Sequence, residues 1–146
     1  MQAYKIEELQ YYVYGGFMPV EIEYTKDNIG VVLFAKGIVT GKELTTAIKN
    51  VYNDERFISL KYWIGDRTAC GRFLLNEKEL VAIAKLNEKE SQRNPGILLA
   101  LVAPNAEAFG VSRQFEAHGE DSKFVTQVFR DRQSANEWID QNLKRA

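Results

Sequence analysis

The sequence predicts an α/β protein built on a mixed, mainly parallel five-stranded sheet with about four helices. Two observations carry this prediction. From residue 29 to the end, apolar β-branched stretches alternate with amphipathic helical stretches, which is typical of parallel strands joined by helices. The 146 residues are 45% hydrophobic and 27% charged, and no Gly, Ser and Pro-rich linker divides them. We therefore expect one domain over residues 19–146, preceded by an N-terminal extension over residues 1–18.

The first two strands are predicted to form a hairpin at one edge of the sheet. Residues 20–24 alternate apolar and acidic side chains, the pattern of a strand with one face in water. Residues 26–28 supply turn chemistry, and residues 29–38 form an apolar run that suits a strand buried on both faces. The shorter strand should therefore lie outermost, antiparallel to the longer one.

The next helix and strand follow from capping and periodicity. Thr40 and Glu43 have the spacing of a capping box, which predicts a helix start. Apolar residues then recur at helical spacing and should face the sheet: Leu44, Ala47, Ile48, Val51 and Tyr52. Residues 57–64 are predicted to form the third strand, and residues 65–72 a polar loop after it.

The second half of the chain repeats this alternation. Asn76 is predicted to cap a second helix, and residues 97–103 are predicted to form a central strand. Asn105 should begin a third helix. Residues 123–129 should form a further strand, followed by a last helix that Asp131 caps. The predicted inner residues of the three helices are Leu80, Ile83, Ala84 and Asn87; Ala108, Val111, Phe115 and His118; and Ala135, Trp138, Ile139 and Leu143.

Composition excludes several function classes. Nineteen Lys and Arg against twenty Asp and Glu give a net charge of -1, so no basic field attracts nucleic acid or anionic lipid. Cys70 has no disulfide partner, and together with His118 it supplies too few ligands for the usual zinc centres. The apolar run 97–103 is too short to cross a bilayer. We therefore expect no metal or cofactor, no nucleic acid, no membrane span, and a cytoplasmic protein with an unpaired thiol.

The N-terminal extension is unusually aromatic. Charged residues interrupt it, which argues against a secretory signal. It should pack back on the domain, cover a subunit contact, or leave an apolar patch for a partner. A homodimer is the commonest assembly and is our expectation. The tyrosines concerned are Tyr4, Tyr11, Tyr12 and Tyr14.

No standard catalytic signature is present. The sequence contains no G-x-S-x-G, H-E-x-x-H or phosphate-binding glycine loop. Cys70 and His118 are the conventional nucleophile and base, but nothing local joins them, so we expect a protein that is not an enzyme.

A candidate site lies in residues 65–72, which combine a carboxylate, two guanidiniums, a hydroxyl and a thiol. Ligands of open α/β sheets bind beyond the carboxyl ends of strands, where this stretch is expected. The same residues also fit a plain polar loop in which Asp66 pairs with Arg67 or Arg72. In the third helix, Arg113 points away from the inner stripe and is either a site residue or a solvated one. The candidate ligand- or partner-binding residues are Asp66, Arg67, Thr68, Arg72, Phe109 and Arg113.

Four stretches also carry a family resemblance. They are Gly37-Ile38-Val39-Thr40, Trp63-Ile64-Gly65-Asp66-Arg67, Ala108-Phe109-Gly110-Val111-Ser112-Arg113, and Val128-Phe129-Arg130-Asp131 followed by Ala135 and Trp138. Their order and residues resemble the STAS-like proteins, and more closely the bacterial SpoIIAA-like family, which is largely uncharacterised. The resemblance implies a small α/β domain used for interaction and regulation, sometimes with a ligand pocket, and without an established reaction.

The resemblance also bears on phosphorylation. In the anti-sigma-factor antagonists of the wider STAS group, a phosphorylatable serine follows an aspartate in Asp-Ser-Ser-Gly at a helix start. Asp66 matches that aspartate and Thr68 is the nearest hydroxyl, whereas Arg67 and Cys70 depart from the pattern.

Two functions follow as predictions. The first is a non-enzymatic regulatory or protein-interaction module of STAS-like fold. The alternative is a protein that binds a small anionic or lipid-like molecule through the stretch after the third strand and through the third helix.

Overall fold

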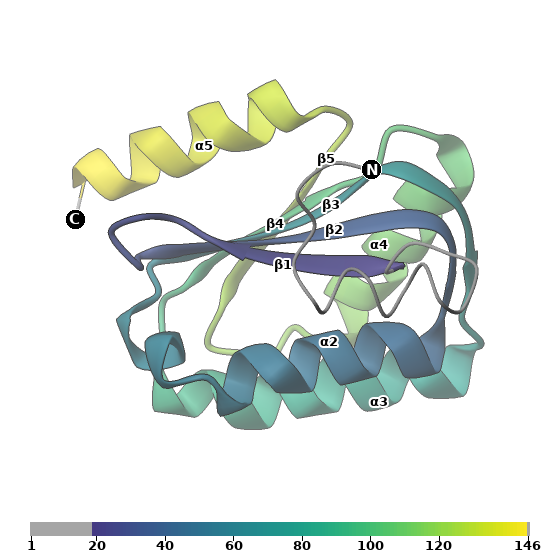
Figure 1. Cartoon of the computed structure of the whole chain (residues 1–146), viewed down its shortest axis with the longest axis horizontal. Helices are drawn as coiled ribbons and strands as arrows, with labels where there is room; N and C mark the ends of the chain where they lie inside the picture. Colours follow the sequence, from purple (N-terminus) through teal and green to yellow (C-terminus); the bar gives the residue numbers. More distant parts are fainter. Residues whose placement is uncertain (1–18, 146) are drawn as a thin grey trace, which may run out of the picture.

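A computed structural model describes residues 19–145, so the predictions about residues 1–18 and their tyrosines lie outside the described residues. Within that range five strands form one sheet (Figure 1), in the order β1 (Val20–Tyr24), β2 (Gly30–Thr40), β3 (Tyr62–Leu74), β4 (Leu98–Val102) and β5 (Val125–Phe129). β1 pairs antiparallel with β2, and every other pair is parallel. The predicted α/β class, the mainly parallel sheet and the antiparallel edge strand are confirmed.

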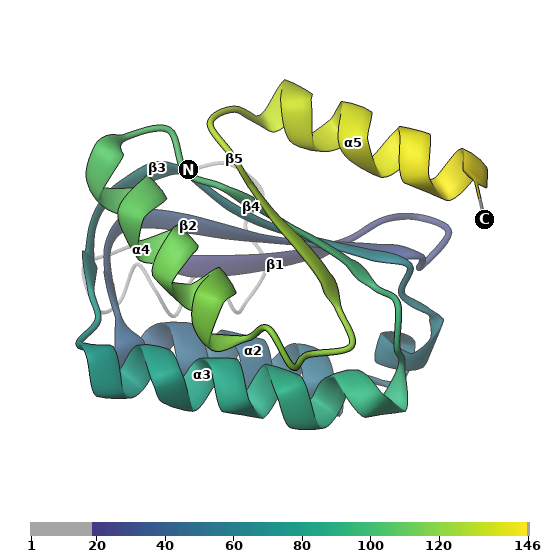
Figure 2. The same cartoon turned by 180° about the vertical axis from the view of Figure 1, so that it is seen from behind.

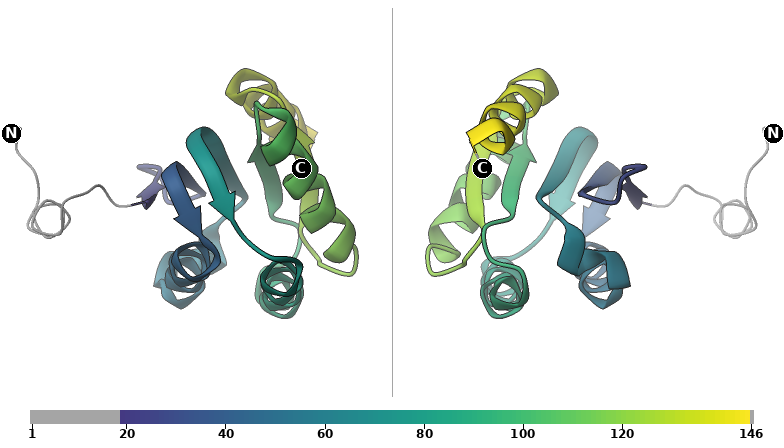
Figure 3. Two further views of the ribbon diagram at one scale, coloured as in Figure 1. Left: turned by 90° about the vertical axis from the view of Figure 1, so that its right-hand side faces the viewer. Right: turned by 90° about the vertical axis from the view of Figure 1, so that its left-hand side faces the viewer.

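Helices cover the sheet unequally (Figures 2 and 3). The helices α2 (Gly41–Asn53), α3 (Glu77–Glu90) and α4 (Ala106–His118) lie on one face, and α5 (Arg132–Arg145) lies alone on the other. The apolar core is accordingly in two parts. The larger part, which includes Trp63 and Phe115, lies under the three helices, and the smaller part, which includes Ile64 and Ile139, lies under α5.

The helix starts are those that the sequence predicts. The Thr40 hydroxyl accepts from the Glu43 amide at 3.2 Å, while the Glu43 carboxylate accepts from the Thr40 amide at 2.9 Å. Asn76 caps α3 with the same reciprocal pair, and Asn105 and Asp131 accept from amides in the first turns of α4 and α5. The inner stripes of α2 and α3 are buried as predicted.

The inner stripe of α4 differs from the prediction. The buried residues of α4 are Ala108, Ser112 and Phe115, whereas Val111 is only half-buried and His118 is exposed. Ser112 therefore joins the buried stripe, whereas Val111 packs against the core from the edge of the stripe.

The third strand also differs from the prediction, in both its start and its end. Glu55–Ser59 is a short 3-10 helix, η1, capped by Asp54, so the strand begins later than expected. It then runs to Leu74, and the predicted polar loop is wrong because residues 65–72 are part of β3. In that stretch Asp66, Arg67 and Cys70 are buried, and the other residues are half-buried or exposed. The irregular burial and the polar composition conceal the strand in the sequence.

The added length of β3 forms an extension of the sheet. β4 pairs with β3 only as far as Asp66, opposite Val102, so residues 67–74 pair with β2 alone. The pairing with β2 shifts register twice, first between Phe34 and Lys36 and again between Gly37 and Ile38, which leaves extra residues in β3. Such β-bulges redirect side chains, and the first lies at Arg67 and Thr68, among the candidate residues.

Candidate functional site

Arg67 is a buried cation on the face of the sheet covered by α2, α3 and α4. The residue is 7% exposed, and its Nη1 donates a hydrogen bond to Ser112 Oγ of α4 at 2.6 Å. The guanidinium carbon lies 4.3 Å from the centre of the Phe73 ring. Among residues 19–145, no carboxylate lies within ion-pair distance of this guanidinium. Burial lowers the pKa of Arg67 to about 10, so the side chain remains cationic at neutral pH.

Arg67 lines a cavity of about 50 Å³ between the sheet and the helices. The walls are otherwise mainly apolar, with Leu33 from β2, Ile48 from α2 and Leu101 from β4 among them. Gly65 also lines the cavity, and a Cβ at that position would lie 3.1 Å from the Leu101 side chain. The glycine therefore leaves space that almost any other residue would fill.

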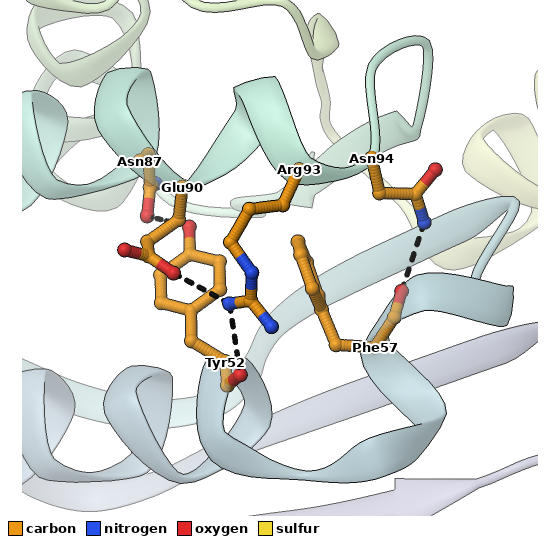
Figure 4. A network of polar contacts seen from close by, with 6 residues as sticks. All are labelled: Tyr52, Phe57, Asn87, Glu90, Arg93 and Asn94. Atoms are coloured by element: carbon orange, nitrogen blue, oxygen red, sulfur yellow. Dashed lines mark hydrogen bonds and ion pairs between the residues drawn. The ribbon is translucent and has the colours of Figure 1, made fainter.

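Asn87 of α3 is the other buried polar residue in the cavity wall, and a network of polar contacts holds it (Figure 4). The Tyr52 hydroxyl donates to Asn87 Oδ1, and burial raises the pKa of the Tyr52 phenol, which keeps its proton on the oxygen. Arg93 Nη1 donates to the Tyr52 carbonyl at 3.1 Å and to Glu90 at 2.6 Å, while its guanidinium lies 4.9 Å from the Phe57 ring. The network joins α2, η1 and the end of α3, and so fixes the orientation of the Asn87 amide.

Asp66 precedes Arg67 in the chain and lies on the opposite face of the sheet. Its Oδ1 accepts from the Thr68 amide at 2.9 Å and from the Thr68 hydroxyl at 2.6 Å, and its Oδ2 accepts from Arg132 Nη1 of α5 at 3.0 Å. The pairing of Asp66 with Arg67 or Arg72 that a polar loop would allow is therefore wrong. The carboxylate instead satisfies the amide left free by the β-bulge and ties α5 to β3.

The other candidates are not part of this arrangement. Arg72 is exposed and pairs with Ile38 of β2, its carbonyl accepts from the Cys70 thiol at 3.4 Å, and among residues 19–145 its guanidinium has no hydrogen bond or ion pair. The Phe109 ring lies 4.1 Å from the guanidinium of Arg130. The side chain of Arg113 is 63% exposed. The structure thus brings together Asp66, Arg67 and Thr68 on two faces of one strand, and places the remaining three candidates elsewhere.

Sequence reasoning missed the partners of the central residues. Ser112, which accepts from Arg67, is four residues after Ala108 and three before Phe115, so helical spacing could have placed it on the buried stripe. A buried serine hydroxyl needs a hydrogen-bond partner, which would have indicated a polar residue nearby. Arg132 had no comparable signal, because it is one of several charged residues in α5.

The conventional nucleophile and base are not in contact. Burial raises the pKa of the Cys70 thiol, which favours the unreactive protonated form at neutral pH. His118 Nε2 lies 4.0 Å from Glu77 of α3, and no hydrogen bond between His118 and Cys70 occurs in the described part of the chain. Thr68 lies within a strand, and α3 begins only at Glu77, so the helix-start setting of the STAS phosphoacceptor is not reproduced.

Over the described range 19–145, no group of three or more His, Cys, Asp or Glu residues is placed to hold a metal ion. In the same range, no helix is long and apolar enough to cross a membrane.

This arrangement of strands and helices is similar to that of a solved structure from Shewanella loihica PV-4, an uncharacterised protein of the DUF3478 family with a SpoIIAA-like fold. The superposition covers 82% of this chain and 91% of that one, with a TM-score of 0.51 and 15% sequence identity. This chain has a SpoIIAA-like fold. The fold implied by the family resemblance is therefore confirmed. No protein-family model and no curated protein sequence matches the chain, and the likeness to a SpoIIAA-like structure at this identity shows the fold alone.

Proposed function

We propose that this SpoIIAA-like chain is a non-enzymatic regulatory module that binds a small ligand in the cavity between the sheet and helices α2, α3 and α4. One observation carries the proposal: Arg67 is a buried cation at the wall of an apolar cavity, with no carboxylate partner among residues 19–145. A buried charge is costly unless another charge compensates it, and a bound anion would do so. The geometry thus favours the small-ligand alternative over a purely protein-binding role.

The cavity itself can be tested with small molecules and methyl NMR. Titration with 1-butanol and with sodium butyrate should shift the methyl signals of Leu99 and Leu101, which line the cavity. The methyl signals of Ile38 and Val125, which are exposed, serve as controls and should not move. If neither compound perturbs the cavity methyls selectively, and the freshly purified protein shows a clean apo mass by native mass spectrometry, the proposal is wrong.

A protein-interaction role remains the second candidate, supported by exposed residues on the strand extension and on α4. Thr68, Arg72 and Arg113 are exposed, whereas Arg67 is buried and cannot contact a protein partner directly. A pull-down with Arg113→Ala and Arg67→Met separates the possibilities. Loss of a partner with Arg113→Ala alone favours a surface contact, and loss with Arg67→Met alone favours a partner that responds to the ligand-bound state.

Location and assembly are further parts of the proposal. The single thiol of Cys70 is compatible with a reducing compartment, so we place the protein in a bacterial cytoplasm. We also propose a homodimer, because closed two-fold dimers are the commonest assemblies. Light scattering on the full chain during size-exclusion chromatography checks the dimer, and a monomer mass at micromolar concentration would contradict it.

A further inference from the structure

We infer that the cavity takes a short apolar monocarboxylate, whose carboxylate serves as the counter-ion of Arg67. This inference rests on the proposed function and narrows it to a chemical class. It depends on the donors that Arg67 has left, on the charge of the cavity wall, and on the volume of the cavity.

The guanidinium of Arg67 has donors to spare. It carries five N–H groups, and among the described residues one acceptor, Ser112 Oγ, takes a hydrogen bond from it. The Phe73 ring packs against the face of the guanidinium, whose carbon lies 4.3 Å from the ring centre. This contact fixes the orientation of the guanidinium plane. A planar carboxylate can pair with the free edge of such a group through two parallel hydrogen bonds.

The charge of the wall favours a singly charged ligand. Among residues 19–145, Arg67 is the one charged residue that lines the cavity, and Asn87 adds an uncharged amide. A phosphate group carries close to two negative charges and three strong acceptor oxygens, so part of its charge and some of its oxygens would be buried without a partner. A carboxylate needs only the one cation, and the apolar walls can take a hydrocarbon tail.

The volume sets the length of the tail. A cavity of about 50 Å³ has room for about four water-sized spheres, by the measure in which one sphere needs roughly 10–15 Å³. This corresponds to a carboxylate with a short chain, on the scale of propionate or butyrate. A longer acid such as octanoate exceeds this volume.

The decisive comparison is between an acid and its neutral counterpart of the same chain length. Isothermal titration and methyl NMR of the full chain with butyrate and with 1-butanol, at matched ionic strength, should show butyrate binding at least about tenfold more tightly, because charge-assisted pairs are the strong ones. Arg67→Met should remove this preference while 1-butanol still binds. Arg113→Met, the same change at an exposed arginine, is the matched control and should keep the preference.

Each alternative result has a defined meaning. Equal binding of butyrate and 1-butanol to the unaltered chain overturns the carboxylate inference but leaves the proposed cavity function standing. Competition by inorganic phosphate as effective as that by butyrate overturns the preference for a single charge, and tighter binding of octanoate overturns the length limit. If neither butyrate nor 1-butanol enters the cavity and the freshly purified protein shows a clean apo mass, the proposed function fails as well. These outcomes use the unaltered protein, so they hold even if Arg67→Met does not fold.

Discussion

Asp66 and Arg67 are adjacent residues of one strand, both buried and of opposite charge, yet their surroundings differ completely. The Asp66 carboxylate accepts hydrogen bonds from Thr68 and pairs with Arg132 on the α5 face. The Arg67 guanidinium, on the face covered by three helices, donates to a neutral hydroxyl and borders a cavity. The Asp66 charge is compensated within the described chain and so stabilises the fold. The Arg67 charge has no such partner among residues 19–145, which is the basis for proposing a ligand there.

The largest effect is expected from removing the compensated charge. Asp66→Ala takes away the acceptor of the Thr68 amide at the β-bulge and the partner of Arg132, and should lower the free energy of unfolding by about 3 kcal/mol. Arg132→Ala should cost much less, about 1 kcal/mol, because the Arg132 side chain is 35% exposed. Urea unfolding followed by circular dichroism measures both. Equal costs for the two variants would show that the carboxylate does no more than pair with Arg132.

Ser112→Ala tests the face of the sheet that carries Arg67, where a smaller loss of stability is expected. It removes the acceptor of Arg67 while leaving the cation in place, and should destabilise the apo protein by about 1.5 kcal/mol. Gln114→Ala, on the exposed side of the same helix, is the control and should change stability by less than about 0.5 kcal/mol. In an Arg67→Met background the cost of Ser112→Ala should largely disappear. A cost that persists there would contradict the role assigned to this hydrogen bond.

Arg67→Met should act in the opposite direction. Because it replaces an uncompensated buried cation by an apolar side chain of similar length, it should raise the free energy of unfolding of the apo protein by about 1 kcal/mol. Saturating butyrate should stabilise the unaltered protein and not the variant. Denaturant melts with and without butyrate check this, and an apo variant clearly less stable than its parent would argue that Arg67 is simply structural.

The smallest effect concerns the single thiol. Burial raises the pKa of Cys70, and the nearby Arg67 cation partly offsets the rise. Arg67→Met should therefore raise the pKa of Cys70 further, moving the pH profile of its alkylation by iodoacetamide to higher pH. Arg132→Gln should leave that profile in place, since Arg132 lies on the other face of the sheet. A shift in both variants would mean that the two faces are not electrostatically separate.

Much of the fold could be predicted from the sequence because its signals are local. Capping pairs such as Thr40 and Glu43 lie three residues apart, and the inner stripes of α2 and α3 repeat within a few turns. The end of β3 was predicted wrongly as a loop, because two β-bulges and a run of polar residues interrupt the alternation of apolar and polar side chains expected of a strand. The site could be predicted only in part. Arg67 and Asp66 stand out in the sequence, but their partners Ser112 and Arg132 lie 45 and 66 residues away, and only the tertiary structure brings them together.

The strand order has a consequence for how the chain assembles. Each strand pairs with the next one in the sequence, so the sheet can grow in the order of synthesis without threading. In that order β3 would pair with β2 before α4 and α5 cover Arg67 and Asp66. Both side chains would then lose their water when Ser112 and Arg132 pack against them. On the Asp66 face that step supplies a counter-charge, whereas on the Arg67 face it does not. A ligand anion of the class proposed above would therefore stabilise the packing of α4 on that face of the sheet.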